Sequence, residues 1–320
     1  MSARLTRRRA VLGACGLAAA GIAGFRAHAA ARGLVARSRA GLAFGTTISL
    51  TAAGPDPDAL DAALTEGIAA MRAVEHEASL FRPDSALSRL NREGRLDAPP
   101  HHLATMLGFA LTLAETTGGA FDPTVQPLWP LWSRAAEGGG RPDPGALRHC
   151  LARVGWRRVN LAPEAIVLET GTGVTLNAVV QGYAADVVMA ALRARGVADA
   201  FVDTGEFGAV GTHADGSPWR LGLADPRRKG EVAAVIAPFT GFAATSGDYN
   251  MAFSADFRDH HIFDPATGFS PRGLASVTVT APTGLLADGL STACMVLGRE
   301  RGRALVAEHP GCAVRVTEKT

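Results

Sequence analysis

The sequence lacks a block of basic residues, an acidic tail and an internal repeat. It has 32 Lys and Arg against 30 Asp and Glu, which leaves a formal net charge of +2. Nucleic-acid binding needs a denser positive surface than this, so that class of function is disfavoured. The apolar stretch from Ala10 to about Phe25 is too short and too weakly apolar for a membrane span, which needs about 20 strongly apolar residues.

Cysteine is also scarce. The chain has four cysteines, and Cys15 lies in the N-terminal apolar stretch. The other three, Cys150, Cys294 and Cys312, are far apart and have no metal-binding spacing. At most one disulfide can form among them, and small buried side chains are the favoured interpretation.

The N-terminus carries the sequence pattern of a targeting signal. Arg7, Arg8 and Arg9 precede the apolar stretch, and Ala27-His28-Ala29 follows it as a small-x-small cleavage site. This pattern predicts a twin-arginine signal peptide over residues 1–29, a linker over 30–41 and a periplasmic location. Two alternatives stay open: a lipid anchor on Cys15, whose context resembles a lipoprotein cleavage box, and an uncleaved membrane anchor.

The remaining chain, 47% hydrophobic and 19% charged over its full length, has the composition of an ordinary globular protein. Helical periodicity and strand-like runs alternate irregularly, with hairpin-like pairs, which favours an α+β fold. The expected helices are 57–79, 101–116, 183–195 and 285–297. The expected strands are 44–50, 159–161, 165–168, 200–202, 232–236, 276–280 and 313–316. Residues 133–146 are expected to form a surface loop.

The segment 285–297 is apolar on nearly every face, which is typical of a buried helix. Asp288 and Thr292 lie four residues apart and therefore side by side. A buried carboxylate is costly unless it is paired or binds a metal, and carboxylate and hydroxyl oxygens suit Mg²⁺. The alternative is an Asp288 paired with an arginine or with backbone amides.

Other segments are ambiguous when taken singly. Gly118-Gly119 allows a close backbone approach to a ligand but also makes an ordinary turn. His261, beside His260, is a candidate general base near Asp264, although a histidine pair in a loop is more often solvated surface. The small residues 244–248 and the segment 177–186 before a helix are equally consistent with turns or with ligand contact.

Taken in order, seven motifs resemble the FAD:protein FMN transferase family, also called the ApbE family. The resemblance covers about residues 42–317 and implies one domain over 42–320, an α+β unit related to the T-fold with mixed or antiparallel sheets flanked by helices. The motifs are FGTT (44–47), PDSALSRLN (83–91), GGAFDPTV (118–125), QGYAAD (181–186), ATSGDY (244–249), HIFDPATG (261–268) and APTGLLADGLSTA (281–293).

The resemblance implies an activity. The family uses Mg²⁺ to cleave FAD, moves the FMN part onto a Ser or Thr hydroxyl of a partner protein through a phosphoester bond, and releases AMP. Two alternatives use the same site: a pyrophosphatase that hydrolyses FAD to FMN and AMP, and a non-catalytic exported carrier of FAD.

The resemblance also implies roles for individual residues. Asp288, Thr292 and the carbonyl of Ala178 match the metal ligands, and His261 matches the histidine near the reacting phosphate. The positions that match FAD contacts are Phe44, Phe81, Ala120, Phe121, Asp122, Thr175, Gln181 and Ile262.

Two positions depart from the family pattern. Gln181 replaces a charged residue of many members, and Glu206 adds a bulky acid where Gly is typical. Together with the segment 213–226, these features are similar to the NosX branch, which is associated with nitrous-oxide reductase maturation. That branch implies an acceptor with an exported FMN-binding domain, such as a NosR-like membrane flavoprotein.

Overall fold

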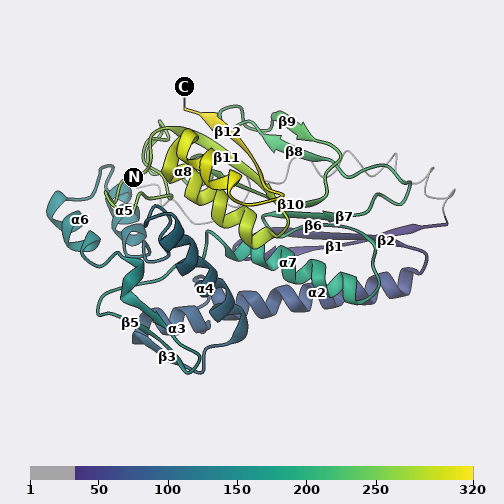
Figure 1. Cartoon of the computed structure of the whole chain (residues 1–320), viewed down its shortest axis with the longest axis horizontal. Coiled ribbons are helices and arrows are strands. Elements are labelled where there is room, and N and C mark those ends of the chain that lie inside the picture. Colours follow the sequence, from purple (N-terminus) through teal and green to yellow (C-terminus); the bar gives the residue numbers. More distant parts are fainter. Residues whose placement is uncertain (1–32, 320) are drawn as a thin grey trace, which may run out of the picture.

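The computed structural model describes residues 33–319, and its centre is a seven-stranded antiparallel sheet (Figure 1). The strands that are adjacent in this sheet are not always adjacent in sequence, because helices and smaller sheets are inserted between them. In spatial order the strands are β1 (Val35–Ala43), β2 (Thr46–Gly54), β6 (Asp199–Asp203), β7 (Phe207–Val210), β10 (Gly241–Gly247), β11 (Leu274–Ala281) and β12 (Ala313–Glu318).

The two faces of this sheet are covered by different layers. Side chains alternate between faces along a strand, so in β6 Ala200 and Val202 join the main core while Phe201 points to the opposite face. On that opposite face a hairpin of β8 (Leu221–Ala224) and β9 (Val232–Ile236) closes a smaller core around Trp219 and Phe239.

Three long helices cover the main-core face of the sheet: α2 (Pro57–Ala78), α7 (Val180–Ala194) and α8 (Gly284–Ala307). Helix α2 begins where the Asp56 side chain accepts hydrogen bonds from the first-turn amides, with Pro57 at the first helical position. It packs along α7, and α7 packs on α8, which lies against β10 and β11. The three helices and the sheet therefore enclose one continuous core.

Helices α7 and α8 cross in direct backbone contact. A Cβ atom added at Gly182 would overlap the carbonyl oxygen of Gly284, and one added at Gly284 would overlap the carbonyl oxygen of Gly182. Only glycine at both positions allows this approach, because any larger residue would separate the two helices. The first turns of both helices are thereby fixed relative to each other.

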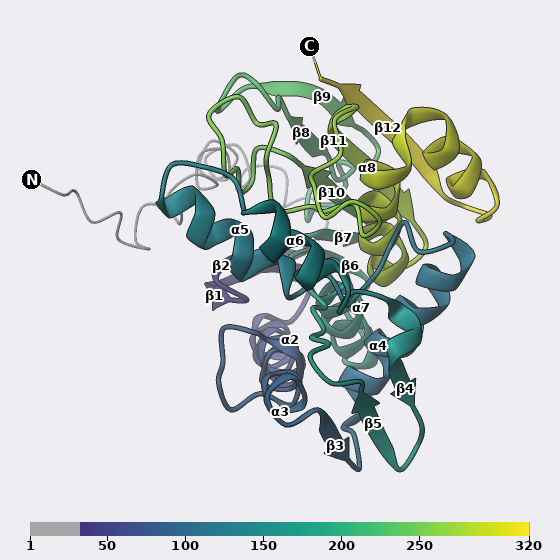
Figure 2. The same cartoon turned by 90° about the vertical axis from the view of Figure 1, so that its left-hand side faces the viewer.

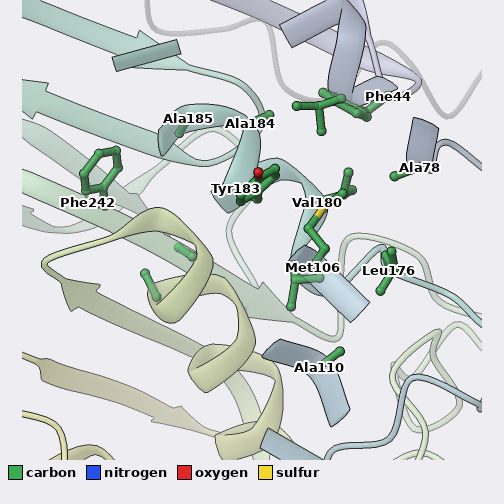
Figure 3. Close-up of a cluster of buried hydrophobic side chains, with 14 of the residues drawn as sticks. Phe44, Ala78, Met106, Ala110, Leu176, Val180, Tyr183, Ala184, Ala185 and Phe242 are labelled. Atoms are coloured by element: carbon green, nitrogen blue, oxygen red, sulfur yellow. The ribbon is translucent and has the colours of Figure 1, made fainter. Parts of the chain in front are cut away.

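A second part of the chain packs beside α2 and α7 (Figure 2). Helix α4 (His101–Thr116) and the short helix α3 (Ala86–Glu93) pack with α2 and a three-stranded sheet of β3 (Arg95–Asp97), β5 (Ala165–Leu168) and β4 (Val159–Leu161). A 3-10 turn at Trp156–Arg158 precedes β4. Figure 3 shows that this part shares the main core, since Met106 of α4 lies in one cluster with Val180 and Tyr183 of α7.

Helices α5 (Leu128–Glu137) and α6 (Pro144–Leu151) support the long connection between β10 and β11, residues 248–273, which we call the His261 loop. Trp132 of α5 is fully buried among Phe253, Phe263 and Phe269 of this loop. Its indole N–H donates to the carbonyl of Gly268 at 2.8 Å. The loop has no helix or strand of its own, so such contacts determine its conformation.

The α+β prediction is confirmed. The expected helices over 57–79 and 101–116 correspond to α2 and α4, and the expected hairpin corresponds to β4 and β5. The helix expected over 285–297 is α8, which continues to Ala307 across a kink at Gly298.

Three structural expectations differ from the structure. Residues from Val35 onward, expected as part of a linker, form the edge strand β1, and the expected loop 133–146 contains the end of α5 and the start of α6. The strand expected from Phe44 begins at Thr46, because Phe44 and Gly45 have positive φ and make the turn from β1 to β2.

The three cysteines within residues 33–319 are free; Cys150 and Cys294 are buried and Cys312 is partly buried. The predicted signal peptide, with Cys15, lies outside the described residues. Within the part of the chain that the structure describes, no helix is long and apolar enough to cross a membrane.

Replacing Gly284 with Ala should destabilise the protein by about 3 kcal/mol or more, because the new methyl group overlaps the backbone of α7 and forces the helices apart. Urea unfolding measures the change. The control is Gly140→Ala, where an added Cβ has nothing within 4 Å and the change should stay within about 0.5 kcal/mol. Equal stability of the two variants would contradict the assigned contact.

Candidate functional site

The helix crossing places a buried carboxylate. Asp288, in the second turn of α8, is only 5% exposed, and its Oδ2 accepts a hydrogen bond from the Gly182 amide at 3.0 Å. Burial raises the pKa of Asp288 to about 7, with the charge of Asp186 adding to the rise and the Gly182 hydrogen bond opposing it. Among the described residues, no Lys, Arg or His forms an ion pair with Asp288.

The Ala178 carbonyl lies just before the start of α7, whose N-cap is Val179. The first α-helical hydrogen bond runs from the Tyr183 amide to the Val179 carbonyl, so the Ala178 carbonyl precedes the bonds of the helix. The Gly182 amide belongs to the first turn, where amides have no partner within the helix, and it donates to Asp288. One close approach between two glycines thus brings together the carboxylate and the carbonyl that sequence reasoning assigned to a metal.

Thr292 lies one turn beyond Asp288 on α8. Its hydroxyl is 2.9 Å from the hydroxyl of Ser246 on β10, which is also 2.8 Å from that of Ser291. The hydroxyl of Ser291 donates to the Asp288 carbonyl at 2.9 Å. These hydroxyl contacts fix Thr292 against the end of β10, so the third predicted ligand lies on the same side of α8 as Asp288.

A carboxylate, a hydroxyl and a backbone carbonyl are the oxygen donors that a hard divalent cation takes. The described residues contain no group of three His, Cys, Asp or Glu side chains that could hold a metal ion. This is consistent with a site that supplies one charged side chain and leaves the other positions to water or substrate, as Mg²⁺ sites commonly do. A buried Asp288 without a cationic partner fits such an ion.

Two further acids lie near Asp288, and sequence reasoning gave neither a role in the site. Asp186 of α7 caps the start of α8, because its Oδ1 and Oδ2 accept from the amides of Gly284 at 2.6 Å and Leu285 at 2.8 Å. Burial raises the pKa of Asp186 to about 6. In the sequence, the only local indication of this role is that Asp186 lies one helical turn after Gly182.

Glu206 approaches from the turn between β6 and β7. Its side chain is buried, and Oε2 accepts from the Thr245 amide at 3.0 Å. Burial first, and then the charge of Asp288, raise the pKa of Glu206 well above its usual value. A Cβ at Gly205 would overlap the Gln181 amide group, so Gln181 packs against the residue that precedes Glu206.

His261 is held in one tautomer. Its Nδ1 lies 3.1 Å from the carbonyl oxygen of Met251, and its backbone amide donates to the same carbonyl at 3.0 Å. A carbonyl can only accept, so Nδ1 carries the proton and Nε2 presents a lone pair, as a general base requires. Burial lowers the pKa of His261, which favours the neutral base; the Met251 hydrogen bond and the charge of Asp248 partly oppose this.

The neighbouring His260 differs from a solvated histidine. It is fully buried, its Nε2 donates to the carbonyl of Pro271 at 3.3 Å, and its Nδ1 accepts from the Ile262 amide at 3.4 Å. Burial lowers its pKa to about 4. His260 therefore holds the loop together, and Ile262 is buried beside it.

The segment 118–125, which holds the predicted FAD contacts Ala120, Phe121 and Asp122, lies beside the segment that holds the predicted contact Thr175. The Thr175 amide donates to the Pro123 carbonyl at 2.8 Å, and Val125 pairs with Gly173. The Asp122 carboxylate is used inside this loop: Oδ1 accepts from the Thr124 hydroxyl at 2.5 Å and from its amide at 2.8 Å, and Oδ2 accepts from the Trp156 amide at 2.8 Å. Asp122 thus shapes the backbone around Ala120 and the buried Phe121.

Phe44 and Phe81, two further predicted FAD contacts, both lie near the turn from β1 to β2. Phe44 is buried at the β1–β2 turn, where its amide donates to the Glu75 carboxylate at 2.7 Å. The Phe81 ring lies 3.5 Å from where a Cβ of Gly45 would be, yet it is 69% exposed. A cavity of about 820 Å³ opens beside Leu80, Asn91, Gln126 and Gly173. Two of these residues are close in the chain to predicted FAD contacts: Leu80 precedes Phe81, and Gly173 lies two residues before Thr175.

Comparison with known proteins agrees with this arrangement. The family described as the ApbE family matches residues 44–316. The chain belongs to the ApbE family. It is 35% identical over 298 residues to the FAD:protein FMN transferase of Treponema pallidum, covering 86% of this chain and 82% of that protein. It is also 35% identical over 261 residues to the transferase of Vibrio cholerae, covering 77% of this chain and 76% of that protein.

Solved structures of the ApbE family share the fold. The ApbE protein of Thermotoga maritima superposes with a TM-score of 0.79 at 27% identity, covering 89% of this chain and 94% of that one. The flavin transferase ApbE of Vibrio cholerae gives a TM-score of 0.77 at 29% identity, covering 90% and 94%. The α+β arrangement described above is therefore that of the ApbE family.

Replacing Asp186 with Asn should remove a pH dependence of stability. A folded-state pKa of about 6 exceeds the unfolded value, so the stability that protonated Asp186 contributes is complete below about pH 4 and is lost as the pH rises through 6. The difference in free energy of unfolding between the wild-type protein and the variant should therefore shrink by up to about 3 kcal/mol across this range.

Urea unfolding of both proteins in EDTA, at several pH values from 4 to 7, measures this difference. Asp97→Asn on the surface controls for the removal of one exposed carboxylate. If the difference in free energy of unfolding instead grew with pH, the hydrogen bonds from the Gly284 and Leu285 amides would have a larger effect on the pKa of Asp186 than burial has.

Proposed function

We propose that this protein transfers FMN from FAD to a Ser or Thr hydroxyl of a partner protein, releases AMP, and requires Mg²⁺. The observation that carries the proposal is the oxygen set at the α7–α8 crossing: the buried Asp288 carboxylate, the Ala178 carbonyl just before α7 and the Thr292 hydroxyl. Membership of the ApbE family and similarity to proteins named FAD:protein FMN transferase support the reaction class.

His261 is the proposed general base. The acceptor hydroxyl gives its proton to Nε2 of His261 while its oxygen forms a bond to the FMN phosphorus of FAD. The bond between that phosphorus and the bridging oxygen breaks, and AMP leaves with the electron pair. The Met251 carbonyl keeps the proton on Nδ1, so that Nε2 is free to accept from the start.

Asp288, Ala178 and Thr292 would hold Mg²⁺, which neutralises pyrophosphate charge and stabilises the leaving phosphate in transfer at phosphorus. Asp288 is the only charged member of this set. Its raised pKa means that the protein without metal holds Asp288 partly protonated near neutral pH, so Mg²⁺ binding displaces a proton. The Gly182 amide keeps the carboxylate oriented in both states.

The acceptor and the location form part of the same proposal. The predicted twin-arginine signal would deliver the protein, already folded, to the periplasm. The acceptor would then be an exported FMN-binding domain, and the Gln181 and Glu206 departures favour a NosR-like membrane flavoprotein. Gln181 packs on Gly205, and the neighbouring Glu206 is close enough to Asp288 for their charges to interact, so both would act on the metal end of the site.

Incubation of the purified protein with FAD, Mg²⁺ and a candidate acceptor domain should add the mass of an FMN phosphoester to that acceptor. Asp288→Ala should lower the rate at least about a hundredfold, since it removes the charged ligand. Mass spectrometry of the acceptor and chromatography of AMP measure transfer and cleavage separately.

Asp97→Ala, which removes an exposed carboxylate, is the matched control and should transfer at the wild-type rate. Steady AMP release without an adduct on any acceptor would replace the transferase with an FAD pyrophosphatase. FAD binding without AMP release would leave only a carrier.

The pH profile of transfer should reflect the lowered pKa of His261. The base acts when it is unprotonated, and a lowered pKa moves the acid limb of kcat/KM below about pH 6.5, the ordinary value for histidine. Initial rates at saturating Mg²⁺, which keeps Asp288 ionised, measure the limb. This acid limb should be absent from the pH profile of the residual activity of His261→Ala. An acid limb centred above pH 7 in the wild-type protein would contradict the assignment.

A further inference from the structure

A buried ion cluster lies under the His261 loop and has no part in the site described so far. Asp248, the first residue of the loop, is fully buried, and its two oxygens accept from the two Nη atoms of Arg227 at 2.8 and 2.9 Å. Nζ of Lys319 lies 3.3 Å from Asp248 Oδ2. A fully buried carboxylate requires such partners, because an unpaired charge inside a protein is costly.

Lys319 uses all of its donors at this place. Besides Asp248, its Nζ donates to the carbonyls of Phe257 at 2.9 Å and Pro271 at 3.3 Å. An ammonium has three protons, and here it meets three acceptors from the beginning, middle and end of the His261 loop. The Lys319 side chain is only 12% exposed, so water replaces these contacts poorly.

The cluster continues directly to the histidines. The Pro271 carbonyl that accepts from Lys319 also accepts from Nε2 of His260, the residue before His261. The guanidinium of Arg227 lies over the ring of Phe257, 4.8 Å from its centroid. The loop has no helix or strand, and its backbone pairing near His261 is limited to the short bridge between Ala252 and His260, so these contacts add to the few backbone hydrogen bonds that hold the main chain there.

The backbone of Lys319 is held independently of its side chain. Its amide donates to the Gly273 carbonyl at 3.1 Å, which continues the pairing of β12 with β11. A change of side chain at this position therefore removes the three contacts to the loop and leaves the strand in place.

We propose that Lys319, acting with Asp248 and Arg227, is a positioning residue that fixes the His261 loop and so keeps His261 directed at the reacting phosphate. The part of this inference that concerns catalysis rests on the proposed function of His261. The part that concerns the loop rests only on the contacts above.

Three variants at or near Lys319 separate positioning from general stability. Lys319→Met keeps the length of the side chain and removes its charge and donors, whereas Lys319→Arg keeps a charged donor. Arg299→Met is the matched control, because it breaks the exposed Arg299–Glu318 pair, whose acid is the neighbour of Lys319. Each variant is also made in the His261→Ala background.

The first readout is hydrogen–deuterium exchange of the loop amides, read from peptides that cover residues 248–262, in the full-length protein without FAD. Lys319→Met should raise exchange there at least about tenfold, with Lys319→Arg close to wild type and Arg299→Met unchanged. Wild-type exchange in Lys319→Met would overturn the proposal, whether or not the protein proves to be a transferase.

The second readout is FMN transfer at saturating FAD, with FAD affinity measured separately by flavin fluorescence. Lys319→Met should slow transfer on the order of tenfold to a hundredfold, while FAD affinity changes less than about twofold, because the catalytic group is misplaced and the substrate site is intact. Lys319→Arg should restore most of the rate.

In the His261→Ala background, Lys319→Met should have no further effect, since two residues that act through one group are not additive. An equal loss in both backgrounds would overturn the positioning role. Absence of transfer by the wild-type protein with every acceptor would instead refute the proposed function, and the exchange result would still decide the role of Lys319 in the loop.

Discussion

The contact between Gly182 and Gly284 is the constraint on which the candidate metal site depends. Because neither residue has a side chain, α7 and α8 approach until their backbones touch. That approach gives Asp288 the Gly182 amide and lets Asp186 reach the start of α8. The predicted ligands thus come from two places in the sequence, Ala178 before α7 and Asp288 with Thr292 on α8, and a single packing event brings them together.

The electrostatics of the site follow from the same packing. Asp186, Glu206 and Asp288 are all drawn out of water near one point, and burial raises the pKa of each. Backbone amides, which are dipoles rather than full charges, are the partners that the fold provides for them. A bound divalent cation would relieve this concentration of negative charge. The burial of these three acids therefore supports the proposed metal site.

Sequence reasoning worked where the cause is local. The apolar periodicity of 285–297 and the four-residue spacing of Asp288 and Thr292 are properties of one helix, and both appear in the structure.

Sequence reasoning failed where the cause is distant. Residues 35–41 form a strand because β2 pairs with them, and their exposed side chains give no apolar alternation. The end of α5 at 133–137 was obscured by the glycines that follow, and its stability comes from the burial of Trp132 under the His261 loop. Neither the backbone contact at Gly182 nor the cluster at Lys319 has a signal in its own segment.

The two halves of the candidate site are built by different means. The metal side stands on two packed helices, whose backbone hydrogen bonds and core contacts make it rigid without further support. The His261 side stands on a loop of 26 residues without regular structure, between β10 and β11. Its order comes from the aromatic cluster around Trp132, from the Asp259 pairs with Arg141 and Arg272, and from the buried cluster at Asp248. In the proposed reaction, a partner protein that presents a hydroxyl would approach His261 from solvent, whereas the pyrophosphate would meet a cation held by the helices. A loop tied down at separate points can adjust to the partner between those points and still keep its base in place, and a rigid helix pair cannot. The division of the site between helices and an anchored loop therefore matches the two tasks of holding a small substrate and admitting a large one.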